Sequence, residues 1–177
     1  MTNLKSRQKG TFAIEFAIVA LVFAAVITFS MDVAIKLSIR GKIDRLSHSL
    51  VNVIRERTQL YEGVEDVSSA DANEMWKIAV NSLKDSVPNF DETKLGMNVD
   101  WAYSDGVQRM YSVPLGLKCG VAHQLVADFD KHTVAKEDGS KHPIYNINIC
   151  YQISNVFSVG KFGKYTMVES ESWAVGR

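Results

Sequence analysis

The stretch that decides the fold is TFAIEFAIVALVFAAVITFSM, residues 11–31, in which Glu15 is the single charged residue. As a helix rising 1.5 Å per residue, it is about 30 Å long, which matches the hydrocarbon thickness of a bilayer. A carboxylate at the centre of such a helix costs roughly 2.5–3.5 kcal/mol on insertion scales, and less near an end. The stretch therefore predicts one membrane-spanning segment in which the cost of Glu15 needs an explanation.

Three other interpretations compete for the apolar run: a cleaved secretory signal, a plain signal anchor and a buried helix of a soluble domain. The run is too long for a cleaved signal, and no small-x-small cleavage site follows it. The charged leader directly before the run argues against a buried helix. Basic residues flank the run on both sides, so the positive-inside rule does not set its orientation. They are Lys5, Arg7 and Lys9 before the run and Lys36, Arg40, Lys42 and Arg45 after it.

Charge divides the chain into a basic leader, residues 1–10, and a slightly acidic remainder. The leader holds three basic residues and no acidic one, and the remainder carries 17 basic and 20 acidic residues. A near-neutral to acidic protein offers nucleic acid no general attraction, so we expect no nucleic-acid partner.

The helix is predicted to continue beyond the membrane as an amphipathic segment, residues 32–60. No proline interrupts the chain from Thr11 to about Arg57, so a single rod of roughly 70 Å is expected, and a bend, if one occurs, is expected at Gly41. Apolar residues recur there at steps of three or four, which indicates one buried stripe. They are Ile35, Ile39, Ile43, Leu46, Leu50 and Val53. We expect this stripe to pack on the protein's own domain; packing on partner helices is the alternative.

Residues 61–177 are predicted to form an extracytoplasmic α+β domain. A connection at 62–69 precedes a short amphipathic helix at 69–85, and alternating residues then predict strands at 97–103, 107–113, 145–153 and 165–175. The turn signal at 104–106 joins the first two strands into a hairpin. A short helix is expected at 120–130 and a polar loop at 136–143. The predicted fold class is α+β, with the long N-terminal helix packed on an antiparallel sheet.

No motif in the chain predicts catalysis, a cofactor or a metal. Nucleophile elbows, phosphate-binding loops and dinucleotide-binding turns are missing from the sequence. A group of polar residues suggests metal ligands by type, but its spacing is that of a solvated loop. Its members are His123, Asp128, Asp130, His132 and His142. The alternating aromatics favour one face of a sheet core over a base-stacking platform, which would need a basic groove. They are Trp101, Tyr103, Tyr111, Tyr145 and Tyr151.

The two cysteines, Cys119 and Cys150, lie on the same side of the apolar run, which permits one disulfide. If that side faces an oxidising compartment, a bridge closing a loop of about 32 residues would contribute on the order of 3–4 kcal/mol. Two separate buried thiols are the alternative, and the spacing to the histidines does not favour zinc.

The start of the chain carries the most specific motif: a short basic leader ending in Gly10, then Thr11, and Glu15 followed by Phe16 in an apolar run. This pattern resembles the cleavage and assembly motif of type IVb pilin-like precursors. It is most similar to the minor pseudopilins of the tight-adherence (Flp) pilus, the TadE/TadF-like proteins. The motif covers residues 5 to about 30, and the rest of the chain agrees in layout, with a domain of over a hundred residues and a cysteine pair.

The resemblance implies a prepilin peptidase that cuts after Gly10 on the cytoplasmic side and leaves Thr11 as the new N-terminus. It also implies a single-pass protein of the bacterial inner membrane, with a cytoplasmic N-terminus and a periplasmic domain. Expected partners are the peptidase, the major Flp pilin, other minor pseudopilins, the inner-membrane assembly platform and membrane lipid. An ammonium on Thr11 would explain Glu15, because the carboxylate of a neighbouring subunit can pair with it. The rival is a signal-anchored protein whose outer domain senses or binds a ligand and which keeps its leader.

Overall fold

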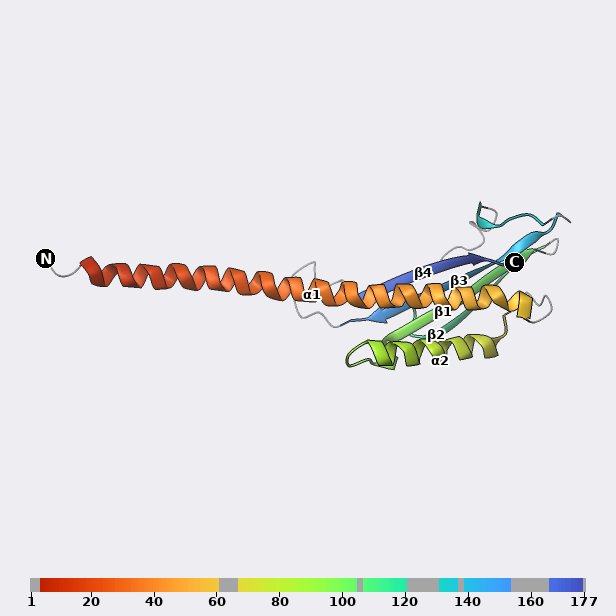
Figure 1. The fold of residues 1–177 in the computed structure, drawn as a ribbon, viewed down its shortest axis with the longest axis horizontal. Helices are drawn as coiled ribbons and strands as arrows, with labels where there is room; N and C mark the ends of the chain where they lie inside the picture. Colours follow the sequence, from red (N-terminus) through yellow and green to blue (C-terminus); the bar gives the residue numbers. More distant parts are fainter. Residues whose placement is uncertain are drawn as a thin grey trace.

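The computed structural model describes residues 4–60, 67–104, 107–120, 131–136, 139–153 and 166–176, with side chains of the first helix described from Phe12 to Glu56. Within these residues, the named elements are two α-helices, one 3₁₀ turn and four strands (Figure 1). In chain order they are α1 (Leu4–Leu60), α2 (Ser69–Ser86), η1 (Glu92–Lys94), β1 (Leu95–Ser104), β2 (Gln108–Gly116), β3 (Lys141–Gln152) and β4 (Met167–Val175).

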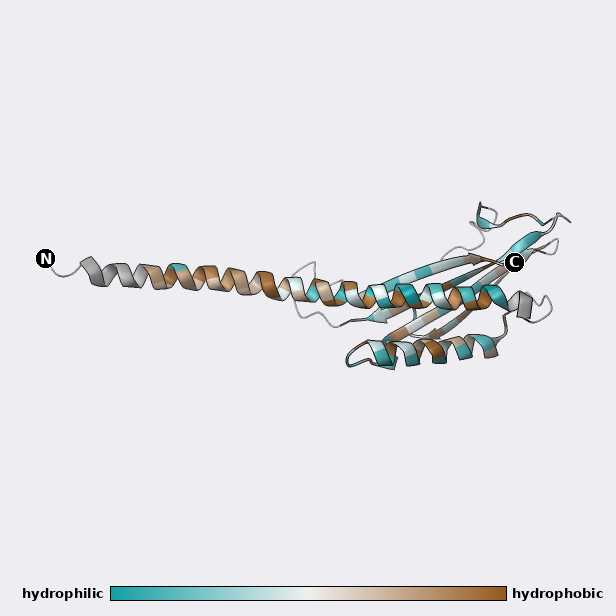
Figure 2. Ribbon diagram, in the orientation of Figure 1, coloured by the Kyte–Doolittle hydropathy of each residue, from teal (hydrophilic) through white to brown (hydrophobic). Residues whose placement is uncertain are grey.

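Helix α1 is a continuous rod whose first half projects beyond the rest of the protein and whose second half lies along the sheet (Figure 1). Figure 2 shows the change along it, from hydrophobic all round to striped where it reaches the sheet. The helix runs through Gly41 without interruption. The prediction of one rod that joins an apolar segment to an amphipathic one is therefore confirmed.

The buried stripe of α1 differs from the predicted one at both ends. Ile35 and Val53 are 49% and 57% exposed. They are separated by 18 residues, about five helical turns, and so lie on the same flank of the rod. They form one edge of the predicted stripe, and the covered face extends beyond its other edge to Val51 and Ile54. The buried members are Ile39, Ile43, Leu46, Leu50, Val51 and Ile54.

The four strands form one antiparallel sheet in the order β2-β1-β3-β4. The predicted hairpin is confirmed, because Ser104 of β1 pairs with Gln108 of β2. The predicted loop at 136–143 is wrong at its end, since β3 already begins at Lys141. Pro143, which has no N–H to donate, is tolerated there because the register with β1 shifts between Ala102 and Ser104.

The core lies between one face of the sheet and the two helices. Alternate residues of β1 and β3 point into it, including Met97, Val99, Ile147 and Ile149, none of which is exposed. The predicted aromatic face is part of this layer, and Trp101 stacks on Tyr111 of β2 with ring centroids 5.2 Å apart. The α+β arrangement, with a long helix packed on an antiparallel sheet, is confirmed.

The second helix begins and ends where the sequence predicts. Ser68 and Asp71 form a capping box at its start, and Pro88 follows the last turn. The buried side of α2 carries Met75, Ala79 and Leu83. Most of the predicted connection at 62–69 and nearly all of the predicted helix at 120–130 lie outside the described residues.

Candidate anchoring and assembly helix

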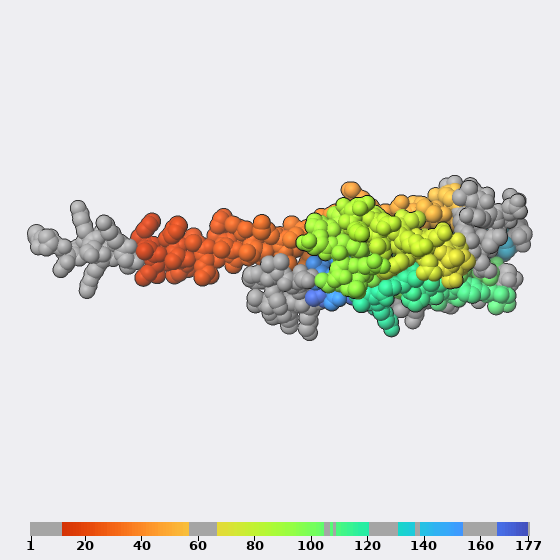
Figure 3. Space-filling view, turned by 90° about the horizontal axis from the view of Figure 1, so that it is seen from below, coloured from red at the N-terminus to blue at the C-terminus, as the bar shows by residue number. Residues whose placement is uncertain are grey.

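The projecting half of α1 is apolar and solvent-exposed. Every large apolar side chain from Phe12 to Met31 is exposed, and no residue of the most apolar window is buried against the domain. The helix is long and apolar enough to cross a membrane. Figure 3 shows this half as a narrow rod extending clear of the domain.

Polar groups inside the rod are satisfied by the helix itself. Thr28 Oγ1 donates to the carbonyl of Ala24 at 3.0 Å, and Ser30 Oγ donates to the carbonyl of Val26 at 2.8 Å. Such back-bonding to the preceding turn removes the need for water or for another protein. These two hydroxyls therefore leave the segment compatible with lipid.

The residues of the predicted processing motif all lie on this rod. Gly10 and Thr11 belong to the helical backbone of α1, and Glu15 and Phe16 are exposed one turn further on. Along the axis, Glu15 stands about 6 Å from Thr11. Among the described residues, no hydrogen bond or ion pair engages the Glu15 carboxylate.

An ion pair marks the point at which the apolar segment ends. Lys36 Nζ lies 2.7 Å from Asp32 Oδ2, one turn earlier on the same helix. Asp32 is buried although its neighbours on the rod are exposed. A charge removed from water is tolerated when an opposite charge meets it at hydrogen-bonding distance. The pair was not predicted, although the i, i+4 spacing in the sequence is its signal.

Polar contacts fix the second half of α1 to strand β4. The hydroxyls of Ser47 and Ser172 are 2.7 Å apart and buried, and Ser170 Oγ donates to Asp44 Oδ1 at 2.8 Å. Sequence reasoning missed these contacts. Their only signal is that polar residues flank the apolar stripe of α1 while serines alternate in β4. The contacts hold the rod at one position along the sheet.

A disulfide joins Cys119, just after β2, to Cys150 of β3, with the Cα atoms 5.6 Å apart. Gly96 of β1 is the register partner of Cys150. A Cβ at Gly96 would lie 2.0 Å from the Leu117 carbonyl oxygen and 2.7 Å from the Cys150 sulfur. The bridge therefore needs glycine at position 96, which the sequence did not reveal.

The structure describes two of the five polar residues whose types suggested a metal site, His132 and His142. His132 meets the edge of Trp173 with ring centroids 5.7 Å apart, and His142 belongs to β3, where its backbone bonds to residues 133 and 134. His123, Asp128 and Asp130 lie outside the described residues. Within the part of the chain that the structure describes, no group of three or more potential metal ligands occurs.

Comparison with known families agrees with the motif on α1. The family model of TadF, tight adherence pilin protein F, matches residues 3–177. The chain belongs to the TadF family. No curated protein and no solved structure matches it significantly.

The match extends the resemblance from the first thirty residues to essentially the whole TadF chain. Membership assigns the protein to the tight adherence pilus and to a family of pilus structural proteins, and it implies interaction with other pilus components. The exposed apolar half of α1 fits a membrane anchor.

Proposed function

We propose that this TadF protein is a minor pseudopilin that supports or initiates assembly of the tight adherence pilus. The observation that carries the proposal is the projecting half of α1, which is apolar on all sides, unburied and continuous with a rod fixed to the folded domain. Such a segment can span the membrane before assembly and contact other apolar helices within a fibre. Its domain would lie in the periplasm and its N-terminus in the cytoplasm.

Processing by a prepilin peptidase would divide the chain after Gly10. Residues 1–10 would be the leader, 11–31 the spanning segment, 32–60 the continuation of the helix and 61–177 the outer domain. Removing the leader takes away its three basic residues, which would otherwise hold the precursor at the anionic cytoplasmic face. Cleavage on that face would also set the orientation that the flanking charges leave open.

Glu15 would then select the position of one subunit beside another. Cleavage creates an ammonium on Thr11, and a small axial offset between neighbouring helices brings it to the partner's carboxylate. In a medium of low dielectric an ion pair offsets its desolvation only when the geometry is good, so the pair favours one register. The exposed position of Glu15 on the rod supports this role.

N-terminal sequencing of the protein recovered from membranes tests the proposal, and the mature chain should begin at Thr11. Gly10→Val should block cleavage and leave a product about 1 kDa heavier, the share of ten residues in a 177-residue chain of 19.7 kDa. Gly41→Val is the matched control, because it makes the same change in the same helix and its Cβ has open space. Normal maturation of Gly10→Val would contradict the proposal, as would a wild-type protein that keeps its leader.

A further inference from the structure

A groove of about 500 Å³ lies between α1 and the segment that follows α2. One wall is formed by α1, including Ala34 and Ser38, and the other by residues 87–89. Ala34 and Ser38 are small and one turn apart, which lets a second helix come close to the α1 backbone. Lys42, the one charged residue among those that line the groove, donates to the Ser86 carbonyl. The groove therefore offers a second helix a mainly apolar surface.

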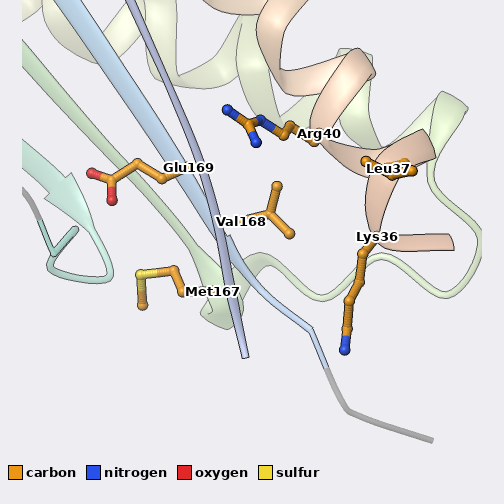
Figure 4. Close-up of a pocket in the computed structure, with 6 residues that line it drawn as sticks. All are labelled: Lys36, Leu37, Arg40, Met167, Val168 and Glu169. Carbon is orange, nitrogen blue, oxygen red and sulfur yellow. The ribbon is translucent and has the colours of Figure 1, made fainter. Parts of the chain in front are cut away.

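The opposite flank of α1 carries charges at the height of this groove. Arg40 follows Ser38 by two residues, which is about 200° around a helix. Figure 4 shows Arg40 extending from α1 toward β4, while Lys36 extends to the other side of Leu37. Covering charged side chains with an apolar helix is costly. At this height an apolar helix therefore fits the groove and not the opposite flank.

Exposed apolar side chains lie in line along both flanks of α1. On the groove flank, Ile35 and Val53 are 49% and 57% exposed, and on the opposite flank Val19 and Leu37 are 65% and 62% exposed. Within each flank the two residues are 18 apart, about five full turns, so they point in the same direction. Ile35 follows Val19 by 16 residues, about 160° around the helix, so the two flanks face nearly opposite ways. The groove flank of one molecule can therefore face the opposite flank of another when their helices are parallel.

A shift of 16 residues, about 24 Å along parallel helices, matches the two flanks. The matched pairs are Ile35 with Val19, Ser38 with Val22, Val53 with Leu37 and Glu56 with Arg40. Three of these pairs place apolar or small side chains together, and the fourth joins opposite charges. Glu56 already accepts from Arg55 of its own chain, and a carboxylate has further acceptor sites. Because the two surfaces differ, the contact is head-to-tail and can repeat along a fibre.

The groove lies beyond the apolar run, whereas the residues that match it begin within that run. Ser38 stands about 10 Å beyond Met31, the end of the run, and Val22 stands about 14 Å before it. We propose that the groove receives the α1 helix of a second copy of this chain that has been raised about 24 Å out of the bilayer. Raising the helix exposes apolar side chains to water, and the groove covers part of them. The contact rests on the proposed function, because assembly is what raises a subunit, and it does not involve Glu15.

Cysteine cross-linking in cells that make the pilus tests the contact. Two tagged copies of the full chain are produced together, one with Ser38→Cys and the other with Val22→Cys, and a short bismaleimide should join them. The native cysteines are bridged and leave no competing thiol. Cells that lack the inner-membrane assembly platform should give no product, because no copy is raised. A product in those cells, or none in piliated cells, would overturn the proposal.

Two control pairs fix the flank and the register. Arg40→Cys in place of Ser38→Cys puts the thiol on the opposite flank, and should lose the product. Val33→Cys in place of Val22→Cys keeps the flank but moves the thiol about 16 Å along the helix, and should lose it too. A product with either control and none with the original pair would overturn the proposal. So would a photo-crosslinker at position 38 that captures lipid or another pilus subunit and no second copy.

A charge exchange tests the same register independently. Arg40→Glu and Glu56→Arg should each lower the yield of the cross-linked product about two- to fivefold, and the two together in every copy should restore it. Lys77→Glu reverses a charge on the exposed side of α2 and should leave the yield unchanged. A lower yield in the double variant than in either single one would overturn the proposal.

N-terminal sequencing of the same samples separates this contact from the proposed function. A mature chain that begins at Thr11, with normal piliation and no cross-linked product, would overturn the contact alone. A retained leader would overturn the proposed function, and the contact with it.

Discussion

Ser47 of α1 and Ser172 of β4 place their hydroxyl oxygens 2.7 Å apart in the interior of the protein, 125 residues apart in the chain. Ser47 also bonds to the backbone carbonyl of Asp44, and the Asp44 side chain accepts from Ser170. An apolar stripe alone would tolerate sliding of the helix, whereas buried hydroxyls must meet their partners. The contacts therefore set the position of the rod on the sheet, and through it the distance from the domain to the membrane.

Removing one member of this pair should cost more than removing both. Ser47→Ala leaves the buried Ser172 hydroxyl without its partner on α1, which should lower the free energy of unfolding by about 1–3 kcal/mol. Ser47→Ala combined with Ser172→Ala should recover part of that loss, because no unpaired group remains. Urea unfolding of the full chain in a mild detergent measures both. Strictly additive losses would show that the two hydroxyls do not stabilise one another.

A buried and an exposed residue of α1 give a matched pair of substitutions. Leu50→Ala removes a buried side chain and should lower the free energy of unfolding by about 2–5 kcal/mol. Val53→Ala, one turn further along, removes an exposed side chain and should change it by less than about 0.5 kcal/mol. Thermal unfolding of the two variants measures the two losses of stability. Equal losses would indicate that the flank carrying Val53 is covered as well.

The disulfide gives a prediction about compartment and about Gly96. In exported protein Cys119 and Cys150 should be joined, and in protein made in a reducing cytosol both thiols should react with an alkylating agent. Removing the bridge should lower the free energy of unfolding by about 3–4 kcal/mol in the chain-entropy model. Two alkylatable thiols in the exported protein would contradict the bridge and remove the support that it gives to an outward orientation of the domain.

Gly96→Ala should hinder the same bridge, because its new Cβ would press on the Leu117 carbonyl and the Cys150 sulfur. The expected result is a larger fraction of reduced protein in an exported sample, counted by thiol alkylation. Gly120→Ala, beside Cys119, is the control, since its Cβ would meet only the Glu169 carboxylate, at an ordinary 3.7 Å. Full oxidation of Gly96→Ala would mean that the neighbouring strands can separate at this point.

Local patterns in the sequence were enough to predict most elements of the fold. The alternation in 97–103 and 145–153, the turn signal before Val107 and the proline after α2 each reflect a rule that acts over a few residues. Such local rules cannot predict contacts between segments that are far apart in the sequence. Val53 and Ile54 both fit a helical stripe, and only the position of the sheet shows which one is buried. Gly96 is necessary because Leu117 and Cys150 approach it in space, and no neighbour in sequence signals this.

The motif that identifies the family also sets the most informative functional test. Glu15→Ala removes a charge that is costly in lipid, so the variant should insert as well as the parent and keep its fold. Piliation should nevertheless fall, because the subunit loses the group that we expect to pair with a neighbour's Thr11 ammonium. Glu15→Asp should be intermediate, since its shorter side chain reaches that ammonium less well.

Surface pili counted by electron microscopy, beside the membrane level of each variant, measure the effect. Glu74→Ala removes an exposed carboxylate from α2 and should leave piliation unchanged, which separates loss of a particular charge from loss of charge in general. The comparison is made at equal protein levels, because a degraded variant would also lose pili. Normal piliation by Glu15→Ala under that condition would show that the carboxylate is a tolerated charge at the membrane surface, with no part in choosing the register of assembly.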